Sequence, residues 1–259
     1  PALLQKKTAC LRPEAPATPP AKDPLILRSW PAGSKGRTGI LLVNLGTPSS
    51  PRPRDVKRFL GEFLSDPRVV DWPRWLWMPV LHGIILTLRP RSSARLYQAI
   101  WNGDSPLRLH MMALERALRE RWGRERPVRS AMRYGEPSIA KAAAELASEG
   151  CTQLRVVPLY PQFSMSQTLS VSDALEALRQ DQPDLGVELI HSYGDHGPYL
   201  DAIVASARKT LATRGEAHLI FSFHGLPQRH IRRGDSYRDE CCRTAALLAE
   251  KFGHKDWSV

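Results

Sequence analysis

Residues 38–48, TGILLVNLGTP, decide the fold class. An apolar run over residues 39–45 ends in Gly46, Thr47 and Pro48. A short apolar run closed by a turn signal is typical of a strand that is buried on both faces. Similar runs follow at residues 129–134, 153–160, 186–193 and 217–224. The sequence therefore predicts five buried strands.

Helical periodicity fills the intervals between these runs. Residues 107–122 carry one apolar stripe, with arginine and glutamate on the other face, formed by Leu107, Met111, Leu114, Leu118 and Trp122. The same spacing recurs in residues 137–148, 171–179, 198–211 and 239–252. Strands that alternate with helices form βαβ units. We therefore expect an α/β fold, with a parallel sheet covered by helices on both faces.

The order of these elements also predicts the domain organisation. Residues 1–37 are rich in proline, alanine, lysine and glycine, which predicts a flexible leader. Four strands fall in residues 38–213, and we assign them to a first α/β lobe. The fifth strand is followed by one more helix, so residues 214–259 are expected to begin a second, incomplete lobe. A length of 259 residues accommodates two such units.

Composition narrows the class of partner. The net charge of +11 favours nucleic acid, an acidic membrane surface or a carboxylate-bearing molecule, although a basic surface that only aids solubility is an alternative. The basic residues are scattered, so we expect no nucleic-acid partner. No strand is followed by Gly-x-Gly-x-x-Gly, and no P-loop is present, so the usual nucleotide-phosphate cradles are excluded.

Cysteine usage and hydropathy predict the compartment. The four cysteines do not form a disulfide framework in a chain of this length, which indicates a reducing environment. The longest apolar stretch, Trp72 to Leu88, is interrupted by prolines, Arg74 and His82, and it is short for a membrane span. No secretory signal is recognisable. We expect a soluble cytoplasmic protein.

Several polar side chains stand where the predicted strands end. Ligands of open parallel sheets bind outside the carboxyl ends of the strands. These ends carry Arg133, Tyr134, Tyr160, His191, Tyr193 and His224. His224 is the most conspicuous, because Gly225 and Pro227 turn the chain directly after it. An imidazole, with an ordinary pKa of about 6.5, can bind a metal or accept a proton at neutral pH. A core or surface histidine is the alternative.

Residues 72–88 carry a second signal. Trp72, Trp75 and Trp77 lie close together beside further apolar residues. The stretch is interpreted either as a core helix or as an apolar lip, over a flat aromatic ligand or against a membrane surface.

LIFSFHGLP at 219–227 is followed by RGDSY at 233–237. These two blocks resemble the signature of the ferrochelatase family, whose members insert ferrous iron into protoporphyrin IX to make haem. Further blocks agree in order, and they are LVNLGTP at 42–48, FLSD at 63–66, GDSPL at 103–107, the pair Arg133-Tyr134 and LYPQFS at 159–164. The resemblance covers residues 39–259. One departure is Gln167, where the family usually has threonine.

The resemblance implies a two-lobed, chelatase-like fold of parallel sheets, with a porphyrin cleft between the lobes. It implies that the second lobe is truncated, because the family's sequences continue beyond Val259 and supply there the acidic residue that faces the histidine. It implies that Fe²⁺ is a substrate, with no permanently bound cofactor. Related chelatases that load cobalt or nickel into another tetrapyrrole, and a non-catalytic porphyrin-binding fragment, are the alternatives.

The resemblance also implies roles for individual residues. His224 matches the family's histidine, as base, metal ligand or both. The substrate-binding set implied by the family's motifs comprises Leu45, Arg89, Ser105, Arg133, Tyr134 and Tyr160. The apolar lip would be residues 72–88, and it would provide a peripheral membrane contact.

Overall fold

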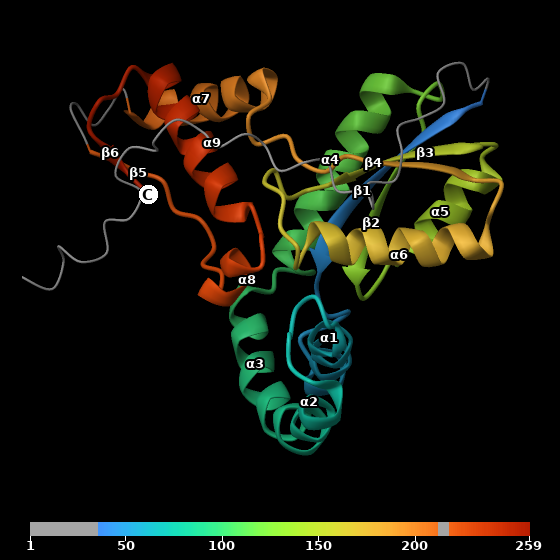
Figure 1. Cartoon of the computed structure of the whole chain (residues 1–259). Helices are drawn as coiled ribbons and strands as arrows, with labels where there is room; N and C mark the ends of the chain where they lie inside the picture. Colours follow the sequence, from blue (N-terminus) through green and yellow to red (C-terminus); the bar gives the residue numbers. More distant parts are fainter. Residues whose placement is uncertain (1–35, 212–217) are drawn as a thin grey trace, which may run out of the picture. The chain divides into compact units, whose positions relative to one another are not determined.

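A computed structural model of the protein describes residues 36–211 and 218–259 (Figure 1). These residues group into two units. The sheet unit comprises residues 36–160 and 165–191, and the carboxyl-terminal unit comprises residues 161–164 and 192–259. The predicted leader, residues 1–37, falls almost wholly outside the described residues. The predicted domain boundary at residues 213 and 214 also lies outside them.

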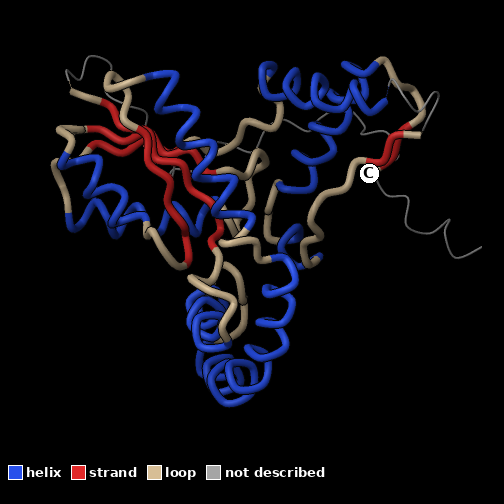
Figure 2. Tube along the Cα trace, turned by 180° about the vertical axis from the view of Figure 1, so that it is seen from behind, coloured by secondary structure: helices blue, strands red, loops and turns tan. Residues whose placement is uncertain are grey.

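The sheet unit contains four parallel strands (Figure 2). They are β1 (Thr38–Gly46), β2 (Val128–Tyr134), β3 (Gln153–Pro158) and β4 (Gly186–Leu189), in the order β2-β1-β3-β4. The predicted parallel sheet is therefore confirmed. The run predicted at 186–193 ends as a strand at Leu189, because β4 pairs with β3 only as far as Val156.

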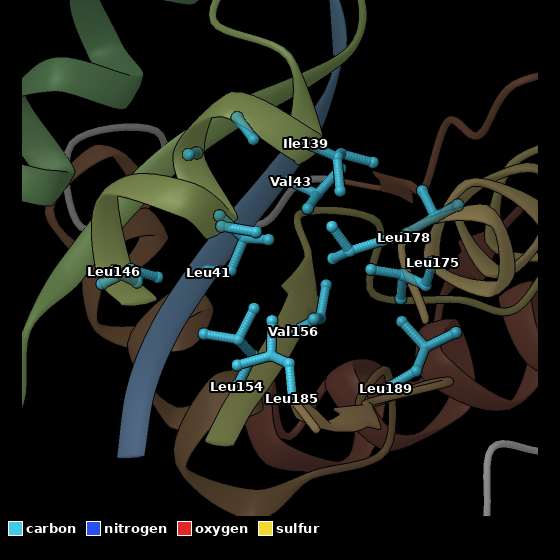
Figure 3. Packing of buried hydrophobic residues seen from close by; sticks show 14 of the residues in the cluster. Leu41, Val43, Ile139, Leu146, Leu154, Val156, Leu175, Leu178, Leu185 and Leu189 are labelled. Carbon is cyan, nitrogen blue, oxygen red and sulfur yellow. The ribbon is translucent and has the colours of Figure 1, made fainter. Parts of the chain in front are cut away.

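Two helices cover one face of this sheet. Parallel strands need long crossovers, and α5 (Ile139–Ser148) and α6 (Thr168–Asp181) lie in those from β2 to β3 and from β3 to β4. Figure 3 shows their apolar side chains packed against those of β1 and β3. Both central strands contribute fully buried residues to this core, which include Leu41, Val43, Leu154 and Val156.

A third helix, α4 (Pro106–Trp122), lies on the opposite face. Side chains alternate between the faces of a strand, and Ala131 of β2 belongs to the core under α5 and α6. The next residue back, Ser130, donates both its backbone N–H and its hydroxyl to the Glu115 carboxylate of α4. This contact also satisfies an outward N–H of β2, which is an edge strand. The prediction of helices on both faces is confirmed.

A helical insertion separates β1 from α4. It consists of α1 (Pro53–Ser65), α2 (Arg74–Val80), a π-helix (Leu81–Ile85) and α3 (Leu86–Ile100). The indole N–H of Trp77 donates to the Leu64 carbonyl at 2.7 Å and ties α2 to α1. The interpretation of residues 72–88 as a core helix is wrong, because Trp75 is 79% exposed and Leu88 is 70% exposed.

The carboxyl-terminal unit is built from α7 (Gly197–Leu211), α8 (Gln228–Arg232) and α9 (Tyr237–Phe252), with two short strands. Leu200 and Val204 of α7 pack against Leu248 of α9. The strand predicted at 217–224 is reduced to β5 (Leu219–Ile220), since its only partner in the described chain is β6 (Trp257–Ser258). Within the described residues, no helix combines the length and apolar character needed to cross a membrane.

Candidate functional site

The sheet has a topological switch point between β1 and β3. The chain leaves β1 toward β2 on one side and later returns to β3 on the other. In open α/β sheets, ligands bind beyond the carboxyl ends of the strands at such a point. Two predicted substrate-binding residues lie there. Leu45 is half-buried at the end of β1, and Tyr160 follows β3, packed in part against the core.

The turn after β1 is fastened to the start of α4. Thr47 donates its hydroxyl to the Ser105 hydroxyl at 2.9 Å, and Arg108 donates to the Pro48 carbonyl at 3.0 Å. Ser105, a predicted substrate-binding residue, is only 3% exposed. Its hydroxyl therefore supports the turn at the switch point.

Gly46 brings β1 unusually close to β2. It pairs with Tyr134, and a Cβ at this position would lie 1.8 Å from the Tyr134 carbonyl oxygen. Its φ of +119° lies in a region that side chains rarely allow. Only glycine fits this approach, which sets the spacing of the two strands at the candidate site.

Arg133 and Tyr134, the next predicted pair, belong to a polar network centred on Asp66. The Asp66 Oδ2 atom accepts hydrogen bonds from Arg133 Nη2 at 2.9 Å, from the Tyr134 hydroxyl at 2.7 Å and from the Ser170 hydroxyl at 2.6 Å. Arg133 Nε also donates to the Ser170 carbonyl at 2.8 Å. The network joins the end of α1, the end of β2 and the start of α6.

The charges in this network control its protonation. Burial by itself would raise the pKa of Asp66, but hydrogen bonds from Ser170, Tyr134 and the Arg68 N–H, together with the charge of Arg133, hold that pKa below its usual value. Burial, reinforced by the neighbouring carboxylate, raises the pKa of Tyr134. At neutral pH the network therefore holds an ionised Asp66, a cationic Arg133 and a neutral phenol.

Arg133 and Tyr134 differ in how much of each side chain a ligand can reach. Tyr134 is 3% exposed, and its hydroxyl is engaged with Asp66. The Arg133 side chain is 22% exposed, and its Nη1 has no hydrogen-bond partner among the described residues. In this arrangement Arg133 can offer one nitrogen to a ligand, whereas Tyr134 orients the guanidinium that stacks over its ring at 4.7 Å.

Arg89 lies apart from this network, on the exposed side of α3. It follows Leu88, one of five exposed large apolar residues within residues 72–88 that we call the helical apolar surface and that are Trp72, Trp75, Leu76, Ile84 and Leu88. Arg89, Arg91 and Arg95 make no ion pair within the part of the chain that the structure describes. The insertion thus combines exposed indoles with unpaired guanidinium groups.

His224 follows β5 and belongs to the carboxyl-terminal unit. Strand β5 pairs with β6 in a separate sheet, so the strand end that carries His224 belongs to another sheet than the ends that carry Arg133 and Tyr160. The His224 side chain is exposed, and its backbone hydrogen-bonds to the Tyr237 hydroxyl. Within residues 36–211 and 218–259, no three His, Cys, Asp or Glu side chains are grouped to hold a metal ion.

The sequence analysis missed Asp66 and Ser170 as parts of the site. Asp66 stands in the FLSD block, but that block says nothing about which residues its carboxylate contacts. Ser170 lies 36 positions after Tyr134 and carries no local signal at all. The amphipathic pattern of α1, whose last helical residue precedes Asp66, was the one clue available in the sequence.

Comparison with known proteins shows which family the chain belongs to. Residues 37–259 match the family model described as Ferrochelatase. The curated ferrochelatase of Azoarcus sp. (strain BH72) is 44% identical over 226 residues, which cover 85% of this chain and 62% of that protein. The ferrochelatase of Aeromonas hydrophila is 46% identical over 224 residues, covering 84% and 69%. The chain thus spans about two thirds of the length of these relatives.

A solved structure also matches. It is that of the sirohydrochlorin chelatase SirB from Bacillus subtilis subspecies spizizenii in complex with cobalt, with a TM-score of 0.44 and 12% identity. The match covers 86% of this chain and 66% of that one. A similarity of this size carries no argument about fold or function.

Proposed function

Because the chain belongs to the ferrochelatase family, we propose that it acts in the insertion of ferrous iron into protoporphyrin IX, with His224 as the proton acceptor, the metal ligand or both. The single observation that carries the proposal is the family match over residues 37–259, which includes His224 and the strand-end blocks. In this proposal iron is a substrate, and no resident cofactor takes part.

The reaction sets clear chemical demands. The metal must lose water ligands, and two pyrrole N–H protons must leave as Fe²⁺ enters, so that the products are the iron porphyrin and two protons. A planar ring hides the nitrogen lone pairs, so a catalyst must hold the ring bent and place a base or ligand above it. Binding energy elsewhere on the macrocycle must supply that strain.

The chain offers groups suited to each demand. The exposed imidazole of His224 is free to accept a pyrrole proton or to hold the metal before transfer. Leu45 and Tyr160 at the switch point offer apolar and aromatic surface to a macrocycle. The unoccupied Nη1 of Arg133, or the exposed Arg89, would form charge-assisted hydrogen bonds with propionate groups.

The helical apolar surface supports a peripheral membrane contact as part of the proposal. Trp75 is 79% exposed and Leu88 is 70% exposed, and the exposed Arg89 and Arg91 follow Leu88 on α3. Indole rings favour the membrane interface, and basic side chains are attracted to anionic lipids. We expect the double variant Trp75→Ser, Leu88→Ser to co-sediment several-fold less with anionic vesicles than wild type and the control Ile220→Ser. Equal sedimentation of all three proteins would contradict this contact.

The decisive test of the activity is anaerobic incubation of the 259-residue chain with protoporphyrin IX and Fe²⁺, following the loss of porphyrin fluorescence. Turnover is expected in wild type and in His110→Ala, which alters an exposed histidine of α4, and it should be abolished in His224→Ala. Binding of porphyrin without metallation would make the chain a binding protein. Faster metallation with Co²⁺ or Ni²⁺, or with another tetrapyrrole, would favour the related chelatases. We also propose a cytoplasmic location, which fractionation of cells that make the chain would test, and recovery mainly in a salt-resistant membrane pellet would contradict it.

A further inference from the structure

One face of α9 contacts two segments of the carboxyl-terminal unit that are far apart in the sequence. Tyr237, Glu240 and Thr244 are spaced three and four residues apart, which places them on the same side of the helix. Each uses its side chain to contact a residue outside α9. Tyr237 belongs to the RGDSY block, for which the proposed chemistry has no other use.

Glu240 fastens the segment Pro161–Ser164. Its Oε2 atom accepts the backbone N–H of Phe163 at 2.8 Å and the hydroxyl of Ser192 at 2.5 Å. Thr244 accepts a hydrogen bond from the Gln162 amide at 3.1 Å and donates to the Glu240 carbonyl at 2.9 Å. Gly194 passes so close that a Cβ there would lie 2.6 Å from the Thr244 hydroxyl oxygen. The fit between this segment and α9 is therefore tight.

Glu240 makes these contacts as an acceptor of hydrogen bonds from uncharged groups. It forms no ion pair within the described residues. Hydrogen bonds to a carboxylate are about twice as strong as neutral ones and demand a defined direction. Its contacts with the Phe163 backbone and the Ser192 hydroxyl therefore position these two segments rather than neutralise charge.

Tyr237 fastens the segment that carries His224. Its backbone N–H donates to Asp235 Oδ1 at 3.0 Å, and Asp235 is 3% exposed, so the start of α9 is anchored. The Tyr237 hydroxyl accepts the backbone N–H of His224 and donates to the buried Cys241 sulfur one turn along the helix. The backbone at His224 is thereby tied to the interior of the unit.

We propose that Tyr237 and Glu240 are positioning residues, Tyr237 for His224 and Glu240 for the Pro161–Ser164 segment that follows Tyr160. Neither residue is assigned a contact with substrate. Each acts through the backbone that it holds, so one helix face organises the candidate imidazole and the loop beyond β3. This inference rests on the proposed function and specifies how its site is built.

The two contacts predict opposite kinetic signatures. Tyr237→Phe removes one hydroxyl and should lower kcat for porphyrin metallation about three- to tenfold, the size expected for one hydrogen bond, with KM unchanged. Glu240→Leu keeps the approximate size of the side chain but removes the Oε2 atom that accepts both hydrogen bonds, and it should raise the KM for protoporphyrin several-fold with a smaller effect on kcat. A general loss of folding would not separate the two parameters in this way.

The experiment measures metallation kinetics, porphyrin binding by fluorescence quenching and the urea midpoint for wild type and four variants. The matched controls are Tyr199→Phe, a tyrosine of α7 whose hydroxyl makes no hydrogen bond within the described residues, and Glu250→Leu, an exposed glutamate of the same helix, and both should behave as wild type. Active wild type with no kinetic difference between the test variants and the controls would overturn the inference alone. A parallel fall of kcat in both test variants that tracks their urea midpoints would also overturn it. A wild-type chain that neither binds nor metallates porphyrin would overturn the proposed function, and the inference with it.

Discussion

Replacing Asp66 by alanine tests the polar network at the end of β2. The change removes the carboxylate partner of Arg133 Nη2, although Nε keeps its hydrogen bond to the Ser170 carbonyl, and the Arg133 side chain is 22% exposed. The Tyr134 and Ser170 hydroxyls, 3.0 Å apart, can still pair with each other. Breaking a fully buried ion pair costs about 3–5 kcal/mol, and a stranded donor costs about 1–3 kcal/mol. Because Arg133 keeps some contact with water, we expect the free energy of unfolding at pH 7 to fall by about 2–4 kcal/mol.

The matched control is Asp173→Ala. Asp173 also pairs with an arginine, since both of its carboxylate oxygens accept from Arg68, but the side chains are 48% and 32% exposed. Exposed pairs contribute about 0–1 kcal/mol. The comparison therefore isolates the effect of burial on two aspartate–arginine pairs.

The contribution of Asp66 to stability should depend on pH in a defined direction. The pKa of Asp66 in the folded protein lies below its ordinary value of 3.8, chiefly because hydrogen bonds and Arg133 outweigh the effect of burial. Its stabilising contribution is therefore complete above pH 3.8 and disappears as the pH falls through the lower, folded-state pKa. Urea unfolding followed by circular dichroism at several pH values should show the gap between wild type and Asp66→Ala closing in acid. An Asp66→Ala variant no less stable than Asp173→Ala at pH 7 would refute the reasoning.

Three further predictions concern single positions. Gly46→Ala should lower the free energy of unfolding by about 3 kcal/mol or more, because the new Cβ would overlap the Tyr134 carbonyl. The control Gly103→Ala, with a φ of +74° and open space around it, should lower it by only about 1–2 kcal/mol, and equal urea midpoints would contradict this. Burial raises the pKa of Cys241 to about 11, so about one thiol in a thousand is ionised at pH 8. Iodoacetamide should therefore alkylate Cys241 slowly in the folded protein and rapidly in urea, as followed by mass spectrometry, and rapid alkylation of the folded protein would contradict this. Trp77→Phe removes the donor to the Leu64 carbonyl and should lower the free energy of unfolding by about 1–3 kcal/mol. The control is Trp75→Phe at an exposed position, and an equal loss of stability in the two variants would show that the hydrogen bond is dispensable.

Sequence patterns predicted the elements of the sheet unit well where burial is symmetric. Strand β1 is covered on both faces, so its apolar run is continuous and easily recognised. Helices α5 and α6 pack one face on that sheet and show the matching period. The insertion α1–α3 was not predicted element by element. In α2 and α3, exposed apolar residues such as Leu88 obscure the contrast between the two faces, whereas α1 carries an amphipathic pattern that the prediction did not use. The length of β5 was overestimated, because an apolar run does not reveal how long its partner strand is.

The sequence alone determined the α/β class, the positions of the core strands and the blocks that carry the family resemblance, including His224. These features are local, since periodicity and short motifs depend on neighbours along the chain. Only the tertiary structure decided that Arg133 and Tyr134 share Asp66, that Glu240 holds Phe163 and that Trp75 is exposed. A hydrogen bond is short and directional, and its partners here are 67, 68 and 77 positions apart. Which donors meet which acceptors is therefore settled only when the strands and helices have packed.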